Sequence, residues 1–398
     1  MEGDKKGITS EELKQHNKAG DLWISIQGKV YDVSEWANEH PGGDVALMNM
    51  AGLDATDAFI AYHPGTAWKY LDKLFTGYYL TDFKLSETSK DYRRLASEFA
   101  KLGLFEKKGH ITMYALTSIV LMFCAVLYGV LCCQSVWAHF GSAVVLGFLW
   151  IQSAYIGHDS GHYQVMNTRG YNKLAQFLAG NSLTGISIAW WKWTHNAHHL
   201  ACNSLDYDPD LQHIPVFATF LLLFSKRRFP DRALNILGIL IFWTWFPLLV
   251  SCIPNWPERV MFVLTSFAVT AIQHVQFCLN HFAADVYTGL PEGNDWFEKQ
   301  TSGTLDISCS SWMDWFYGGL QFQLEHHLFP RMPRSQLRRV SPLVQDLCKK
   351  HNLSYRSLSF WEANVWTIRK LRNVALQARD LANPVPKNML WEAVNTHG

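Results

Sequence analysis

Four long apolar runs constrain the fold of this chain more than any other feature of its sequence. They cover Ile111–Cys133, Trp137–Ile156, Leu234–Ile253 and Val260–Phe282. A helix rises about 1.5 Å per residue, so about 20 apolar residues cross the hydrocarbon core of a bilayer. Each run has at least this length, and within each pair the connection is short. The pattern therefore predicts two transmembrane hairpins, with about four spans in all.

The basic residues predict how these spans are oriented. The first connection, CCQSVWAH, contains no Lys or Arg, and the second, NWPER, contains only Arg259. The opposite ends are flanked by Lys101, Lys107, Lys108, Lys226, Arg227, Arg228, Arg232, Arg334, Arg338 and Arg339. Because Lys and Arg are retained on the cytosolic side, we expect both termini and residues 157–233 to be cytosolic, on an endoplasmic-reticulum membrane. The formal net charge of +1 gives no indication of a nucleic-acid partner.

Histidines gather where the predicted spans reach the cytosol. Among the 17 His, three clusters stand out, with the sequences HDSGH at 158–162, HNAHH at 195–199 and QLEHH at 323–327. On a helix, residues three or four apart lie on the same face. Since all three clusters fall on one side of the membrane by the predicted topology, they can converge on a single site.

So many imidazoles indicate more than one metal ion. Imidazole is a good ligand for Zn, Cu, Fe and Ni, and the seven clustered His exceed what one ion needs. Within the fourth apolar run, His281 is a further expected ligand, because ionisable residues inside a span are costly and are usually functional. His274, seven residues earlier, is a candidate ligand or a hydrogen-bond partner. The expected ligands are His158, His162, His195, His198, His199, His281, His326 and His327.

The cluster spacings HxxxH, HxxHH and QxxHH resemble the three histidine boxes of membrane fatty-acyl and sphingolipid desaturases. Gln323, in place of the first His of the third box, resembles the front-end subgroup. The stretch WWKWTHNAHHLACNSLDYDPDLQHIPVFA is most similar to plant sphingolipid delta-8 (long-chain base) desaturases. This resemblance implies a centre of two non-haem irons, O2 as co-substrate and a long-chain base or ceramide as the lipid substrate. It implies no catalytic residue beyond the metal ligands, with Gln323 as a further candidate at the site.

The N-terminal block carries a second resemblance. The apolar and polar residues of DLWISIQGKVYDVSEW alternate around Gly28, as in a strand hairpin. His40-Pro-Gly-Gly and, 23 residues later, His63 in YHPG resemble the two axial haem ligands of cytochrome b5. Two His on one iron leave no open position, which suits electron transfer. The resemblance implies haem b, with electrons supplied by NADH through a separate reductase, since no GxGxxG fingerprint is present.

We therefore expect an α+β cytochrome b5-like domain fused to an all-α integral membrane desaturase. The predicted segments are a haem domain at 1–84, a solvated helical connector at 85–109, a di-iron core at 110–335 and a cytosolic helical tail at 336–398. An amphipathic stretch at 172–190 is expected at the membrane interface, with Trp190, Trp191 and Trp193 at the level of the headgroups.

One region departs from the resembled family. Between Pro215 and Ser225 the sequence passes directly from FATFLLLF into basic residues, where the family is longer by several dozen residues. We expect the shorter segment to weaken desaturation. Two alternatives stay open from the sequence. One is an acyl-lipid delta-6 front-end desaturase, and the other is a form that acts only as a membrane-anchored cytochrome b5 electron carrier.

Overall fold

The N-terminal residues fold into a small α+β lobe. The computed structural model describes residues 6–108, 110–212, 231–290 and 296–380. The lobe contains a five-stranded sheet in the order β1-β5-β4-β3-β2, formed by β1 (Lys6–Ile8), β2 (Asn17–Lys18), β3 (Asp21–Ile26), β4 (Lys29–Asp32) and β5 (Phe75–Leu80). The predicted hairpin is β3–β4. Its turn residues Gln27 and Gly28 both have positive φ, 54° and 76°, as a two-residue hairpin requires.

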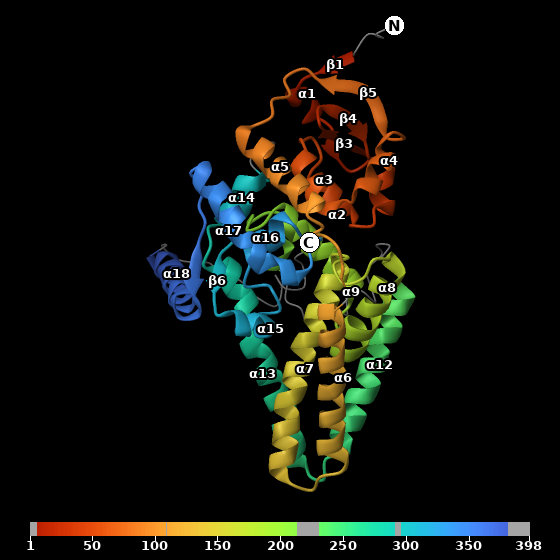
Figure 1. The fold of residues 1–398 in the computed structure, drawn as a ribbon, viewed down its shortest axis with the longest axis vertical. Helices are drawn as coiled ribbons and strands as arrows, with labels where there is room; N and C mark the ends of the chain where they lie inside the picture. Colours follow the sequence, from red (N-terminus) through yellow and green to blue (C-terminus); the bar gives the residue numbers. More distant parts are fainter. Residues whose placement is uncertain (1–5, 109, 213–230, 291–295, 381–398) are drawn as a thin grey trace.

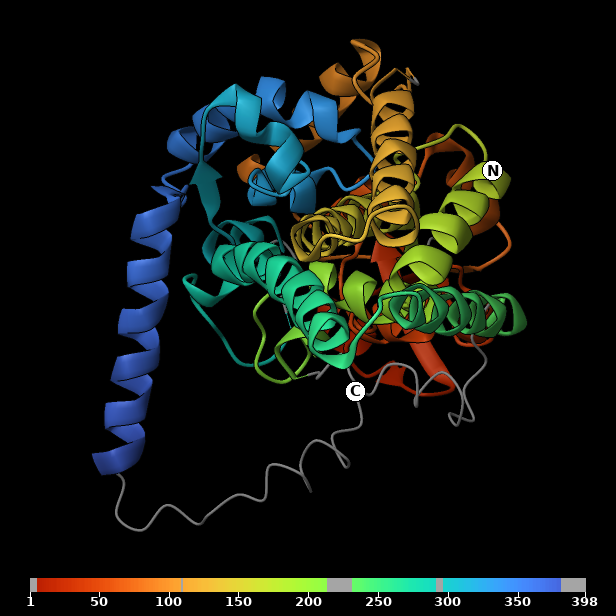
Figure 2. The ribbon, with the colours of Figure 1, turned by 90° about the horizontal axis from the view of Figure 1, so that it is seen from below.

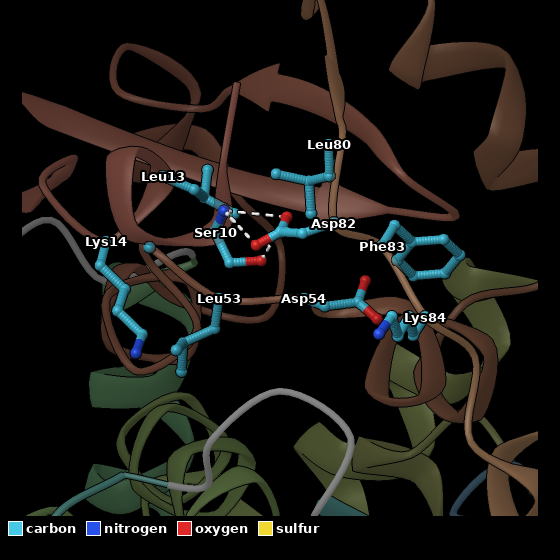
Figure 3. A pocket seen from close by; sticks show the side chains of 10 residues that line it. Ser10, Leu13, Lys14, Leu53, Asp54, Leu80, Asp82, Phe83 and Lys84 are labelled. Carbon is cyan, nitrogen blue, oxygen red and sulfur yellow. Dashed lines mark hydrogen bonds between the residues drawn. The ribbon is translucent and has the colours of Figure 1, made fainter. Parts of the chain in front are cut away.

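Short helices on this sheet carry the two predicted haem ligands. They are α1 (Ser10–Leu13), η1 (Trp36–Glu39), α2 (Asp44–Met48), α3 (Thr56–Tyr62), η2 (Gly65–Ala67) and α4 (Trp68–Leu71). His40 caps the end of η1, and His63 caps the end of α3. A pocket of about 260 Å³ lies elsewhere in the lobe, where the Asp82 carboxylate accepts from the backbone and hydroxyl of Ser10 (Figure 3). No histidine lines this pocket.

Four long helices form the opposite end of the molecule (Figures 1 and 2). They are α6 (His110–Leu131), α7 (Val136–Gly161), α12 (Arg232–Ser251) and α13 (Trp256–Phe282). The connections α6–α7 and α12–α13 lie together at the end far from the lobe, so the helices form the two predicted hairpins. At this end, His139 of α7 is hydrogen-bonded to Glu258 of α13.

Among the described residues, the helices α6, α7 and α12 are long and apolar enough to cross a membrane. The predicted fourth run also forms one continuous helix, α13. Its second half contains the polar residues Gln273, His274, Asn280 and His281.

The segment between the hairpins lies against the bundle and the lobe. It comprises α8 (Arg169–Ala175), the π-helix η3 (Gln176–Leu183), α9 (Ile188–Leu200) and α10 (Pro209–Gln212). The three tryptophans expected at the membrane interface make contacts within the protein. Trp190 is buried beside Ile239, Trp191 stacks on His195, and Nε1 of Trp193 donates to Asp44 of the lobe. The segment from Pro215 to Ser225 lies outside the described residues.

After α13 the chain returns to cover the histidines. The elements are α14 (Trp296–Gly303), β6 (Asp306–Ser308), η6 (Ser311–Met313), α15 (Asp314–Tyr317), α16 (Gln323–Leu328), α17 (Arg334–Lys350), β7 (Ser357–Ser359) and α18 (Phe360–Asp380). Strands β6 and β7 pair in parallel, which adds a small sheet to the region predicted as all-α.

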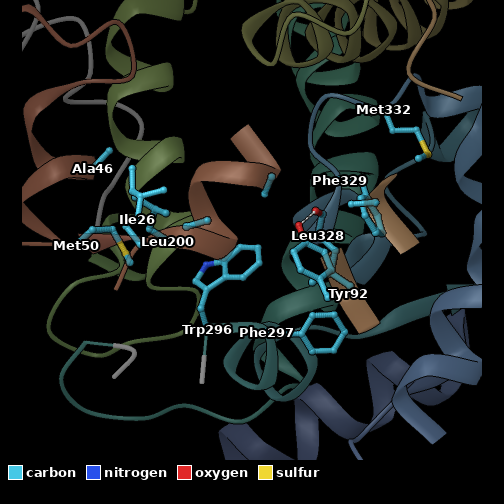
Figure 4. Close-up of a cluster of buried hydrophobic side chains, with 14 of the residues drawn as sticks. Ile26, Ala46, Met50, Tyr92, Leu200, Trp296, Phe297, Leu328, Phe329 and Met332 are labelled. Atoms are coloured by element: carbon cyan, nitrogen blue, oxygen red, sulfur yellow. Dashed lines mark hydrogen bonds between the residues drawn. The ribbon is translucent and has the colours of Figure 1, made fainter. Parts of the chain in front are cut away.

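A single hydrophobic core joins the lobe to the histidine-bearing part (Figure 4). Helix α5 (Glu87–Lys101) lies at this junction and buries Tyr92 and Phe99, whose rings contact Phe329. The Tyr92 hydroxyl donates to Leu328 O at 2.8 Å. The prediction of a solvated connector is therefore wrong for one face of α5. Its apolar residues recur at i, i+4 and i+7, a spacing that places them together on a helix.

Candidate metal centre and haem site

Histidines from four separate elements meet near the ends of the long helices that face the lobe. The first box lies at the end of α7, the second on α9 and the third on α16, and His281 is in the last turn of α13. The structure gathers their ligand atoms into two adjacent groups. Box residues 131 positions apart in sequence, His195 and His326, thus belong to one group.

The first group consists of His158, His162, His195 and His326, whose ligand nitrogens all lie within 4.8 Å of one another. The rings of His158 and His326 are 4.7 Å apart at their centres, and those of His158 and His162 are 4.9 Å apart. Nε2 of His162 and Nε2 of His326 are buried and have no hydrogen-bond partner among the described residues. Such orphaned nitrogens are costly unless something satisfies them, and a metal ion would do so.

The second group contains His198, His281 and His327 with the thiol of Cys202, again within 4.8 Å. Gln323 joins them, because its Nε2 lies 2.9 Å from His281 Nε2 and 3.2 Å from His327 Nε2. The amide oxygen of Gln323 is buried without a partner among the described residues. The two ends of an amide are exchanged by rotating it, so Gln323 can offer an oxygen to this group.

His199 lies between the two groups. Its Nε2 is 3.0 Å from His195 Nε2 in the first group, and its ring stacks on His327 of the second with centres 4.0 Å apart. His274 is elsewhere. It lies on α13, about two turns before His281, and belongs to neither group among the described residues.

A set of acceptors orients the imidazoles. Five of the rings direct Nδ1 to an oxygen: His158 to Asp159 at 2.9 Å, His195 to Asp210 at 3.2 Å, His198 to Asp208 at 2.8 Å, His281 to Gly303 O at 3.2 Å and His327 to Gln300 Oε1 at 2.8 Å. A ring that donates from Nδ1 presents the lone pair of Nε2, which is the arrangement of histidines bound to metals.

Burial and neighbouring charge keep most of these rings neutral. Burial lowers the pKa of His195 to about 4, although Asp210 opposes the shift. Burial also lowers the pKa values of His199, His326 and His327 well below the ordinary value, and the surrounding His add to the effect. His198 is the exception, because Asp208 and Asp210 outweigh burial and raise its pKa to about 9. Neutral imidazole is the form that binds metals.

The sequence prediction missed the orienting residues Asp208, Asp210 and Gln300 and the thiol of Cys202. The two aspartates stand in LDYDPD, nine and eleven residues after His199, so their closeness to the second box was an available signal. No sequence signal pointed to Gln300, because only the packing of α14 against α16 places it beside His327.

The predicted haem ligands face each other in the lobe. The ring centres of His40 and His63 are 5.9 Å apart. Nδ1 of His40 bonds to Gly43 O at 2.9 Å, and Nδ1 of His63 bonds to Phe59 O at 3.2 Å, so Nε2 is the nitrogen that each offers. Two metal–imidazole bonds of about 2 Å place the ligating nitrogens about 4 Å apart, with the ring centres farther out. The spacing thus fits one iron between the rings.

Comparison with known proteins identifies the families of both parts of the chain. Residues 9–80 match the cytochrome b5-like heme/steroid binding domain, and residues 135–246 and 217–359 match the fatty acid desaturase family. This chain belongs to the fatty acid desaturase family, with a fused cytochrome b5 domain. It is thus an oxidoreductase, a membrane lipid desaturase, and the expected fold class is confirmed.

Three relatives show how far the similarity extends. The chain is 67% identical to Delta(8)-fatty-acid desaturase 2 of Arabidopsis thaliana, over 99% of both chains. It is 54% identical to an acyl-lipid (9-3)-desaturase of Borago officinalis, again over 99% of both. It is 32% identical to the Delta 8-(E)-sphingolipid desaturase of Emericella nidulans, over 60% of this chain and 54% of that one.

The alignment also shows that this chain is shorter than its Arabidopsis relative. Its alignment with the Arabidopsis relative has 443 positions, whereas this chain has 398 residues, so at least 443 − 398 = 45 positions hold a residue of the relative alone. The two matches to the desaturase family overlap at residues 217–246, a range that contains most of the region where the sequence departs from the family. The alignment thus agrees with the predicted shortening.

Proposed function

We propose that this desaturase introduces the delta-8 double bond into sphingolipid long-chain bases. The observation that carries the proposal is the 67% identity, over nearly the whole of both chains, to a delta-8 desaturase. The fungal relative names a sphingolipid as the substrate class. The acyl-lipid alternative is less favoured, because the acyl-lipid relative is 54% identical. The carrier-only alternative leaves the two histidine groups without a role.

The two groups are the proposed iron sites. His158, His162, His195 and His326 would hold one iron, and His198, His281 and His327 the other, with Gln323 as a further donor. His199 would complete the set between them. When bound, two irons with O2 supply the oxidation that removes two hydrogens from neighbouring methylene carbons, with O2 reduced to water. Asp159, Asp208, Asp210 and Gln300 hold the rings in place for this reaction.

We propose that the electrons reach these irons from the chain's own haem. His40 and His63 would ligate it, and NADH would supply electrons through a separate reductase. Reduction of one O2 to two waters takes four electrons, of which the lipid gives two and NADH the other two. A tethered donor supplies them without a diffusional encounter between two proteins.

The proposed orientation places both termini and all three boxes in the cytosol, on the endoplasmic reticulum. Glycosylation-acceptor tags should then be modified when inserted near Gln134 or Asn255, at the connections of the two hairpins. Tags near Gly170 or after Gly398 should stay unmodified, because the glycosylation machinery acts in the lumen. Modification of the Gly170 tag would contradict this orientation.

The function is tested in a host that lacks delta-8-unsaturated long-chain bases. Expression of the chain with the family's missing segment inserted after Phe217 should produce these bases, and the 398-residue form should produce clearly less. The reason is the shortening of the chain, which lacks at least 45 positions present in the Arabidopsis relative. Desaturated acyl lipids in place of long-chain bases would assign the other substrate, and equal activity of both forms would show that the segment is dispensable.

A further inference from the structure

Both segments that carry the haem ligands are bonded to histidine-bearing helix α9 or to the loop that follows α16. From α9, Nε1 of Trp193 donates to Asp44 Oδ1 at 3.0 Å, and Nδ2 of Asn196 donates to Gly42 O at 2.9 Å. These bonds fix the loop that follows His40. Three residues after α16, Nε of Arg331 donates to Ala61 O at 3.1 Å, next to the end of α3.

The second glycine of the HPGG motif makes this approach possible. A Cβ added to Gly43 would lie 2.8 Å from Cδ1 of Trp193, which is too close for a real side chain. Gly43 also has φ +97°, a conformation that few other residues adopt. Helix α9 therefore lies directly against the haem-ligand loop, while His195, His198 and His199 of the same helix belong to the iron sites.

One aromatic contact connects the two sites more directly. Tyr62 immediately precedes His63, and its ring meets the ring of His199 edge to face, with centres 5.9 Å apart and an interplanar angle of 87°. The hydroxyl of Tyr62 is buried and has no hydrogen-bond partner among the described residues. Tyr62 therefore contacts His199 through its ring and not through its hydroxyl.

We propose that Trp193, Asn196 and Arg331 form an intramolecular docking surface that holds the haem lobe in its electron-donating position, with Tyr62 as the contact to the iron site at His199. The inference rests on the proposed function, because it assumes both haem and iron. Each transfer moves one electron from ferrous haem to a ferric ion, and NADH through its reductase is the source. The three docking residues are positioning residues, since none is a proposed ligand.

The test uses the full chain, loaded with haem and iron, in lipid nanodiscs. The double variant Trp193→Phe/Asn196→Ala removes both donors to the 40–44 loop and leaves every histidine in place. Amide hydrogen exchange at residues 40–46 should become at least about tenfold faster, because two hydrogen bonds shift a docking equilibrium by that much. After flash reduction of the haem without O2, the decay of ferrous haem should become about tenfold slower by the same reasoning.

Tyr62 provides a matched pair of variants. Tyr62→Ala should slow the decay of ferrous haem, whereas Tyr62→Phe keeps the ring and should decay like the parent. Tyr70→Ala, at an exposed position in the same lobe, is the control for haem binding. All variants should keep the low-spin haem spectrum and the parent's iron content.

Unchanged exchange and unchanged decay in the double variant would overturn the docking surface. A mixing experiment gives a second test. A His63→Ala chain and a His195→Ala chain should stay inactive together, and restored desaturation would overturn the proposal because electrons would then pass between molecules. Failure of the proposed function would look different. In that case the parent's haem would stay ferrous although haem and ferric iron were both present.

Discussion

The His198→Ala chain is expected to lose desaturation by more than about 100-fold, while its haem spectrum stays that of the parent. His198 belongs to the second histidine group and is buried together with Asp208. Its removal takes away a proposed ligand and leaves the Asp208 carboxylate without the ring it orients. The measurement is the yield of long-chain-base product at matched protein level, with the haem absorption recorded on the same sample.

Two further variants sharpen this result. Asp208→Asn keeps the ligand but removes the carboxylate charge that faces Nδ1 of His198, and it should reduce activity by roughly 10–100-fold. His351→Ala is the matched control, because His351 pairs with Asp91 outside both groups and should leave activity intact. Full turnover in His198→Ala would show that the second group is not an iron site.

The His63→Ala chain should lose its low-spin haem band and its desaturation together, while its non-haem iron remains. His63 supplies one of the two facing rings in the lobe, and without it the haem has a single axial ligand. The absorption spectrum of the purified full chain, with product yield in the expressing host, measures both effects.

The control is a histidine of the same lobe that has a different role. His16 bonds to Asp21 at 2.7 Å and stacks on Trp23, so His16→Ala should keep the haem band and the activity. A low-spin spectrum retained in His63→Ala would refute the assignment of this ligand. Activity retained without haem would show that another donor reaches the irons.

Periodicity and spacing predicted the parts of this structure that depend on local sequence. The turn at Gly28, the two hairpins of long helices and the three boxes were all readable, because each occupies a short stretch. The burial of Tyr92 and Phe99 was missed although their spacing is helical, because the many Lys and Arg around them indicated a solvated helix. Charged residues on one face of a helix say nothing about its other face.

The rest depended on contacts between segments far apart in sequence. The sequence predicted Trp193 at the membrane interface. In the structure the haem lobe lies against it, and its Nε1 donates to the carboxylate of Asp44. Strands β6 and β7 are three residues each, too short for alternation to reveal them. The division of the histidines into two groups also could not be read from spacing, because His198 and His199 are neighbours in sequence with different surroundings in space.

The most direct test of the proposed two-iron centre is the iron content of the purified full chain, counted separately for haem and non-haem iron. The account predicts one haem and two non-haem irons per chain, with the iron of the second group lost in His198→Ala and both non-haem irons retained in His63→Ala. A chain that folds and binds haem but holds no non-haem iron would contradict it, and would leave only an electron carrier.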